Sequence, residues 1–258
     1  MFIQGEFMSA ELPKLAIIGY GAMGHEIEKA ALSNGFEVVA KYDIDNPISE
    51  ETNFNFDVAI DFSIGRAVYD NACVLAKNGK NFVIGATGWY DSLELVTNIV
   101  KKYDVGMLWS PNFSIGMNIF MKILQVASKL INLAPGYDIF IVETHHKRKK
   151  DAPSGTAITL GEIILREFKH KDQLLYGNPE GAILPEMLQI SSIRAGDYLG
   201  KHTVTIDSPV DTIELTHNAK NREAFAAGAL LAASWINGKK GVFKFDDILD
   251  QIWFAERE

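Results

Sequence analysis

Near its N-terminus the chain reads Gly19-Tyr20-Gly21-Ala22-Met23-Gly24, which fits the pattern G-x-G-x-x-G. An apolar run at residues 15–18 precedes the pattern, and a helical pattern over residues 23–34 follows it. Between a strand and a helix, the first glycine permits a tight turn and the second lets backbone amides approach a pyrophosphate. The third glycine allows the helix to pack closely on the strand, and the positive end of the helix faces the phosphates. The motif predicts a dinucleotide-binding turn; the alternative is a glycine-rich turn without a ligand.

An acidic residue stands where such folds bind a ribose. Asp43 ends the second predicted strand, 19 residues after Gly24. A carboxylate there accepts hydrogen bonds from a free ribose 2′-hydroxyl, which favours NADH. The next residue, Ile44, offers no partner for a 2′-phosphate, although Lys41 is close in sequence. We therefore expect NADH as the cofactor, with NADPH tolerated.

Strand and helix patterns alternate over the first hundred residues, which predicts βαβ units and a parallel sheet covered on both faces. After Pro111 strand patterns cluster instead, and two of them alternate apolar and polar residues cleanly. The expected fold class is α/β: a Rossmann-type doubly wound parallel sheet with a second α+β domain containing an open mixed sheet. The predicted strands are 15–18, 36–42, 58–62, 82–84, 105–109, 137–143, 188–194, 202–206 and 212–217, and the predicted helices are 23–34, 67–78, 93–101, 115–133, 156–168 and 223–237.

The expected domains are a dinucleotide-binding domain, residues 1–113 with 222–258, and a substrate-binding and oligomerisation domain, residues 114–221. In the second domain we expect one helix among four strands. One covering helix cannot bury two faces and the edges of such a sheet, so partner subunits are expected to complete the burial.

Composition excludes several classes of protein. The 258 residues are 47% hydrophobic, and 25 Lys and Arg against 33 Asp and Glu give a net charge of −8, which disfavours nucleic-acid and membrane-surface partners. No apolar stretch reaches the roughly 18 residues of a membrane span. The single Cys73 excludes a disulfide scaffold and predicts a reducing, cytoplasmic compartment. The N-terminus lacks signal-peptide features, and Met8 is a candidate start that would make residues 1–7 an upstream remnant.

One local feature runs against the acidic average. Residues 143–157 read ETHHKRKKDAPSGTA, with two histidines followed by four cations and a Pro-Ser-Gly-Thr turn. A solvated basic loop is one interpretation. A metal site is a second, disfavoured because neighbouring histidines on an extended segment point to opposite sides. The third is an active site, in which a lysine supplies a proton and a helix N-terminus holds a carboxylate.

This segment resembles the signature of the 4-hydroxy-tetrahydrodipicolinate reductase (dihydrodipicolinate reductase) family, E-x-H-H-x-x-K-x-D-A-P-S-G-T-A, at every fixed position. The similarity covers residues 15–249. It implies NAD(P)H-dependent reduction of 4-hydroxy-tetrahydrodipicolinate, a small dicarboxylate, to tetrahydrodipicolinate in lysine and diaminopimelate biosynthesis. It also implies a homotetramer built through the sheet of the second domain.

The resemblance carries roles onto individual residues. The implied catalytic residues are His145 and Lys149, with Lys149 as the proton donor; the implied substrate-binding residues are His146, Gly155 and Thr156; no metal ligand is implied. The candidate cofactor-binding residues are Gly19, Gly21, Ala22, Met23, Gly24, Asp43, Phe62, Gly85, Thr87, Ser110, Phe113 and Arg222. Departures from the family pattern are Ile44 in place of a basic residue, Ala86 in place of Thr, and Lys201 in place of Glu.

Two other functions stay open on the sequence. A non-catalytic dinucleotide-binding sensor would use the same fold and bind cofactor without oxidising it. Another two-domain NAD(P)-dependent dehydrogenase would generally need a different catalytic residue, often cysteine, and Cys73 falls inside a predicted helix where burial is expected. A nucleic-acid role for the basic segment has no aromatic residues to support it.

Overall fold

The computed structural model describes residues 11–254, and the expectation about residues 1–7 lies outside that range. The chain divides into two compact units. Unit 1 comprises Met1–Ile115 and Arg222–Glu258, and unit 2 comprises Gly116–Asn221. Cys73 is half-buried in unit 1.

Unit 1 contains a six-stranded sheet in which every pairing is parallel, in the order β11-β5-β4-β3-β1-β2. Its first and third strands are buried at every position, as expected for a parallel sheet covered on both faces. The strands are β1 (Leu15–Ile18), β2 (Val38–Tyr42), β3 (Val58–Asp61), β4 (Asn81–Ile84), β5 (Gly106–Trp109) and β11 (Gly241–Lys244).

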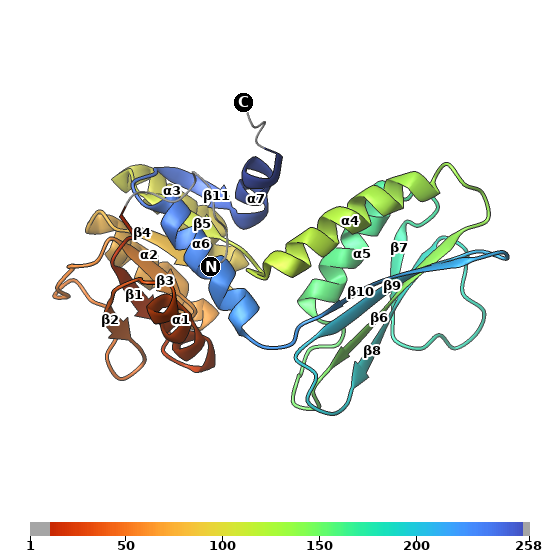
Figure 1. Ribbon diagram of the computed structural model, residues 1–258, viewed down its shortest axis with the longest axis horizontal. Coiled ribbons are helices and arrows are strands. Elements are labelled where there is room, and N and C mark those ends of the chain that lie inside the picture. Colours follow the sequence, from red (N-terminus) through yellow and green to blue (C-terminus); the bar gives the residue numbers. More distant parts are fainter. Residues whose placement is uncertain (1–10, 255–258) are drawn as a thin grey trace. The chain divides into compact units, whose positions relative to one another are not determined.

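Alternate residues of β1 feed two separate cores. Leu15 and Ile17 pack with α1 (Ala22–Ser33), α6 (Glu223–Ile236) and α7 (Phe245–Phe254). Ala16 and Ile18 pack with α2 (Val68–Lys77) and α3 (Leu93–Tyr103). The short 3-10 helices η1 (Gly65–Ala67) and η2 (Tyr90–Ser92) precede α2 and α3. The predicted doubly wound arrangement is confirmed (Figure 1).

Unit 2 contains a five-stranded mixed sheet in the order β10-β9-β6-β8-β7. The central strand β6 runs parallel to β8 and antiparallel to β9. The strands are β6 (Asp138–His145), β7 (Gln173–Tyr176), β8 (Met187–Arg194), β9 (Lys201–Asp207) and β10 (Thr212–Asn218), and the helices are α4 (Ile115–Ile131) and α5 (Gly155–Glu167).

Both helices of unit 2 lie on the same face of its sheet (Figure 1). On that face β6 buries Ile139 and Ile141, whereas Phe140 on the opposite face is 36% exposed. The expectation of one covering helix was therefore wrong, because Phe120 and Leu124 of α4 join the same apolar core.

Three elements were missed in the sequence. The edge strand β7 is short and only half-buried, so it shows no alternation between apolar and polar residues. β11 and α7 follow one another directly near the C-terminus, where no strand or helix was expected. In the part of the chain that the structure describes, no helix combines the length and apolar character needed to cross a bilayer.

Candidate active site

The glycine turn after β1 is built so that two of its glycines admit no side chain. Gly19 has a φ of +84°, and a Cβ there would lie 2.5 Å from the Ser63 nitrogen. A Cβ on Gly24 would lie 2.5 Å from the Gly19 oxygen. Gly21 has no atom within 4 Å of its Cβ position, so its backbone is open to a ligand. The turn thus has the tight bend, close packing and open approach that a pyrophosphate requires.

A cavity of about 570 Å³ opens where β1, β2 and β3 end. The strand order reverses between β2-β1 and β3-β4, and ligands of doubly wound sheets bind at such a switch point. Asp43 lines the cavity, and its Oδ1 accepts a hydrogen bond from the Ile44 amide at 2.9 Å. The lining includes Gly19, Gly21, Asp43, Ile44, Phe62, Ser63, Ile64 and Arg66.

The loop after β3 is held by a buried carboxylate that sequence reasoning did not assign. Asp61 is 2% exposed; its oxygens accept from the Ser63 amide at 2.8 Å and from the Asn71 side chain at 2.9 Å. Burial raises the pKa of Asp61. These bonds fix the segment that carries Phe62 into the cavity.

The other candidate cofactor residues are distributed over the same sheet. Ala22 and Met23 begin α1, and Gly85 and Thr87 follow β4. A Cβ on Gly85 would lie 2.2 Å from the Phe62 ring. These loops follow the carboxyl ends of β1 and β4, which lie on either side of β3, at the edge that binds ligands in this type of sheet.

Outside the glycine turn after β1, two predicted cofactor residues are buried, and one lies away from the cavity. Phe113 is 2% exposed, and its ring packs 4.9 Å from Phe245 and 6.0 Å from Phe62, so only its backbone is available to a ligand. Ser110 is 6% exposed and is hydrogen-bonded to Asn112. Arg222 is the N-cap residue of α6 and does not line the cavity.

In unit 2, residues 145–155, which include both adjacent histidines, connect the end of β6 to the start of α5. Ser154 is the N-cap of α5, and its Oγ accepts from the Ala157 amide at 3.2 Å. Gly155 and Thr156 follow in the first turn, and a Cβ on Gly155 would have no atom within 4 Å. The first turn of α5 lies at the positive end of the helix dipole, where an anion is favoured.

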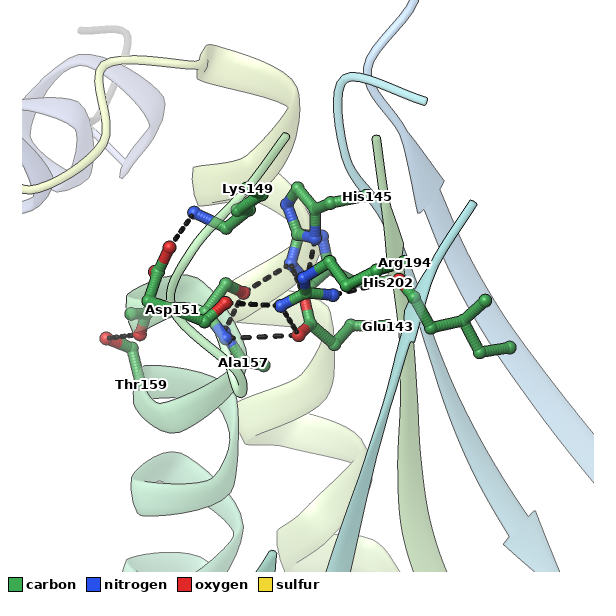
Figure 2. Close-up of polar contacts among 11 residues, drawn as sticks. Glu143, His145, Lys149, Asp151, Ala157, Thr159, Arg194 and His202 are labelled. Atoms are coloured by element: carbon green, nitrogen blue, oxygen red, sulfur yellow. Dashed lines mark hydrogen bonds and ion pairs between the residues drawn. The ribbon is translucent and has the colours of Figure 1, made fainter. Parts of the chain in front are cut away.

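The positive charge of the basic segment, residues 147–150, is partly neutralised by nearby carboxylates. Lys149 Nζ lies 2.9 Å from Asp151 Oδ1, as Figure 2 shows, and Arg148 pairs with Asp197 at 3.1 Å. Burial alone would raise the pKa of Asp151, but the contact with Lys149 outweighs it and lowers that pKa. The amide of His146 donates to the Tyr198 carbonyl at 2.7 Å, which anchors the segment after β6.

A buried polar cluster lies on the helix-covered face of the same sheet and includes three residues that were given no role (Figure 2). Glu143 is fully buried, with its Oε1 2.7 Å from Arg194 Nη2 and its Oε2 2.5 Å from His145 Nδ1. His202 is 4% exposed. Burial, followed by the charge of His145, lowers the pKa of His202 to about 3, so this ring is neutral at neutral pH. The available signal was a charged residue at an inward position of an otherwise apolar strand.

Distance alone would let this cluster hold a cation, because ligand atoms of Glu143, His145 and His202 lie within 4.8 Å of one another. The surrounding charges oppose that interpretation. The Glu143 carboxylate already pairs with the Arg194 guanidinium and accepts from the Ser154 amide at 3.1 Å. A metal ion would have to approach beside the half-buried Arg194, and the positive charge of that arginine disfavours it.

Together these features define a class of protein. A Rossmann-type sheet with a glycine fingerprint and an acid after its second strand binds NAD(P)H. The second unit adds a lysine and histidines beside the N-terminus of α5. The class is that of a two-domain NAD(P)H-dependent oxidoreductase.

Comparison with known proteins identifies the family. The family models described as "Dihydrodipicolinate reductase, N-terminus" and "Dihydrodipicolinate reductase, C-terminus" match residues 13–113 and 116–249. The chain belongs to the dihydrodipicolinate reductase family. A 4-hydroxy-tetrahydrodipicolinate reductase of Christiangramia forsetii is 36% identical over 239 residues, covering 93% of this chain and 98% of the relative. One of Archaeoglobus fulgidus is 39% identical, covering 89% and 96%.

A solved structure has the same fold. The dipicolinate-bound dihydrodipicolinate reductase of a Paenisporosarcina species superposes with a TM-score of 0.73 at 24% identity, covering 92% of this chain and all of that one. An oxidoreductase of Pseudomonas syringae gives a TM-score of 0.55 at 10% identity, covering 88% and 87%.

Proposed function

We propose that this protein reduces 4-hydroxy-tetrahydrodipicolinate to tetrahydrodipicolinate with NAD(P)H, a step of lysine and diaminopimelate biosynthesis. The observation that carries the proposal is the grouping of His145, Lys149 and the N-terminus of α5 within unit 2. Family membership supports the same reaction.

Unit 2 holds the substrate in this proposal. The amides of Gly155 and Thr156 bind one carboxylate at the helix N-terminus, and His146 contacts the substrate beside them. Lys149 supplies positive charge for the second carboxylate. Unit 1 is the dinucleotide-binding domain.

The chemistry divides between the cofactor and the chain. A bound nicotinamide would supply a hydride. The hydroxyl of the substrate leaves as water together with a hydrogen from the neighbouring ring carbon, so that the hydride and one further proton complete the reduction. Lys149 donates the proton that balances the hydride. Before the reaction, the ion pair with Asp151 fixes the position of the Lys149 Nζ. The Nε2 of His145 accepts a hydrogen bond from the substrate. Unlike the Nδ1, which lies against Glu143, this nitrogen is turned toward Gly200.

A coupled assay tests the reaction. The substrate is generated in the cuvette by the preceding synthase, and oxidation of NADH and of NADPH is followed at 340 nm in parallel. Substrate-dependent oxidation is expected. A protein that binds the cofactor and oxidises neither form would be a dinucleotide sensor, and the proposal would fail.

The cofactor preference is proposed to favour NADH while tolerating NADPH. Asp43 suits a free 2′-hydroxyl and repels a phosphate. Lys41 is engaged elsewhere, with its Nζ 2.9 Å from Glu28 Oε1. Arg66 is exposed, lines the same cavity as Asp43 and offers a guanidinium to a 2′-phosphate.

We expect Arg66→Ala to raise the KM for NADPH by about tenfold while changing the KM for NADH by less than about twofold, the size of one charge-assisted phosphate contact. Steady-state kinetics with both cofactors measure this. Lys41→Ala is the matched control, and its NADPH kinetics should stay near those of the parent protein. An equal rise of the KM for both cofactors in Arg66→Ala would show that Arg66 does not bind the 2′-phosphate.

We further propose a cytoplasmic homotetramer assembled through the sheet of unit 2. Its helix-free face exposes Phe140 on β6 and Ile193 on β8, at 36% and 47%. Exposed apolar side chains on an uncovered sheet face are typical of subunit contacts. The single, half-buried Cys73 agrees with a reducing compartment.

The assembly gives a second measurable expectation. Ile193→Lys is expected to convert the tetramer into smaller species, because a lysine ammonium would be desolvated in the contact. Light scattering coupled to size exclusion measures the mass. Leu32→Lys, which replaces another exposed apolar residue on α1 in unit 1, should leave the mass unchanged. An unaltered tetramer in Ile193→Lys would place the contact elsewhere.

A further inference from the structure

Glu143 is a fully buried carboxylate for which the proposed reaction has no direct use. It occupies an inward position of β6, between Ile141 and His145 on the same face. Strand register places it opposite Ser192 of β8 and His202 of β9. Burying an ionised carboxylate is costly unless several partners satisfy it, so its contacts call for an explanation.

The two oxygens of Glu143 have different partners. Oε1 accepts from Arg194 Nη2 at 2.7 Å and from the Ser154 amide at 3.1 Å. Oε2 lies 2.5 Å from His145 Nδ1. Burial alone would raise the pKa of Glu143, but the contacts with His145 and Arg194 outweigh it and hold that pKa well below its usual range. Oε2 is therefore a negatively charged acceptor facing an imidazole nitrogen.

His202 does not compete for that oxygen with a charge of its own. Its Nε2 is 4.0 Å from Glu143 Oε2 and 3.3 Å from Ser154 Oγ. Ser154 Oγ accepts from the Ala157 amide, so its own proton is available to His202 Nε2. Other titratable groups near the cluster are Arg194, which pairs with Oε1, Lys149, which pairs with Asp151, and His217, which acts on His202. Among the described residues of this cluster, the ring of His145 is the group that approaches Oε2 most closely.

Two unprotonated acceptors repel each other at 2.5 Å, and Glu143 is ionised, so the contact favours a proton on Nδ1 of His145. When Nδ1 of a neutral imidazole carries the proton, Nε2 is the nitrogen that can accept a hydrogen bond. Gly200 leaves room beside it, because a Cβ there would lie 3.0 Å from His145 Nε2. We propose that Glu143 is a positioning residue, which fixes the proton of His145 on Nδ1 and presents Nε2 to the substrate. The proposal rests on the proposed function for the identity of the substrate, but not for the position of the proton.

The Glu143→Gln variant provides the sharpest change. A glutamine has one oxygen, and both Arg194 and the Ser154 amide require an acceptor, so that oxygen is drawn to their side. The NH₂ group then faces His145 and needs an acceptor at Nδ1. The proton of a neutral His145 is expected to move to Nε2. Glu143→Asp keeps a carboxylate and is expected to keep the proton on Nδ1.

The proton position is read directly by long-range ¹H–¹⁵N correlation spectra of protein labelled with ¹⁵N-histidine, in which His145→Asn assigns the His145 signals. Nδ1 should carry the proton in the parent protein and in Glu143→Asp, and Nε2 should carry it in neutral Glu143→Gln. This measurement needs no substrate. A parent protein with His145 protonated at Nε2 alone overturns the proposal even if every variant fails to fold.

Kinetics supply the second readout. Glu143→Gln is expected to lower kcat by about 10²-fold, within the range of an acid–base group, with a KM change below about threefold. Glu143→Asp should recover part of the loss. Glu167→Gln is the matched control, because Glu167 pairs with Lys129 and Arg166 in the same unit. It should lose stability without changing the His145 signals or the pH profile of kcat.

The outcomes separate the two proposals. If no preparation oxidises NAD(P)H with the substrate but His145 shows the expected protonation, the proposed function fails and the positioning role of Glu143 stands. If the parent is active and Glu143→Gln keeps both its turnover and the Nδ1 proton, the positioning role is overturned.

Discussion

Replacing Lys149 by alanine is expected to lower kcat by about 10²–10⁴-fold, the usual effect of removing a general acid. Lys149 is partly buried and its ammonium lies 2.9 Å from Asp151, so its charge and position are defined before substrate binds. Without it, the proton that balances the transferred hydride must come from solvent. The coupled assay measures kcat directly.

The control for this substitution is Lys129→Ala. Lys129 also pairs with a carboxylate, Glu167 at 3.6 Å, but on the helix α4 and away from the basic segment. The kcat of the Lys129→Ala variant should match that of the parent protein. Near-normal turnover in a folded Lys149→Ala protein would remove Lys149 from its role as proton donor.

Gly228→Ala is expected to destabilise the protein by about 1–3 kcal/mol, although alanine is the better helix former by about 1 kcal/mol. Gly228 lies within α6, and a Cβ there would stand 1.8 Å from the Phe113 oxygen and 3.2 Å from the Phe245 ring. The segment that carries Phe113 would have to move. Because the family resemblance implies that Phe113 contacts the cofactor, the Kd for NADH should rise together with the loss of stability. Urea denaturation and cofactor titration measure the two effects.

Gly161→Ala is the matched control for that prediction. Gly161 also lies inside a helix, α5, but the nearest atom to its Cβ position is Leu174 Cδ2 at 2.8 Å, the end of a flexible side chain. A rotamer change relieves that contact, so the free energy of unfolding should change by less than about 1 kcal/mol. Equal losses in the two variants would mean that the clash with backbone is not the cause.

The sequence was sufficient to predict a parallel sheet with helices on both of its faces. The first five strands of unit 1 are short, mostly apolar runs that end at a glycine or polar turn, and local pattern determines such elements well. β7 escaped prediction because an edge strand with half-buried residues has no strict periodicity. The second helix on the sheet of unit 2 escaped because which helix packs on which face depends on contacts distant in sequence.

The candidate site was predicted unevenly for a similar reason. His145, Lys149 and the α5 N-terminus lie within one short segment, so spacing alone brings them together. Arg194 and His202 lie 51 and 59 residues from Glu143, and only the pairing of β8 and β9 with β6 brings them to it. Sequence spacing holds no information about that pairing.

Strand β6 has a consequence for how the protein tolerates change. Glu143 and His145 share one face because they are two residues apart, and Thr144 between them points to the other. Inserting or deleting a single residue between Ile141 and Glu143 would turn the side chains of Glu143 and His145 to the face opposite that of Ile139 and Ile141. The two-residue period of the strand therefore determines that Glu143 and His145 lie on the same face. Insertions and deletions in this family should be confined to the loops before and after β6.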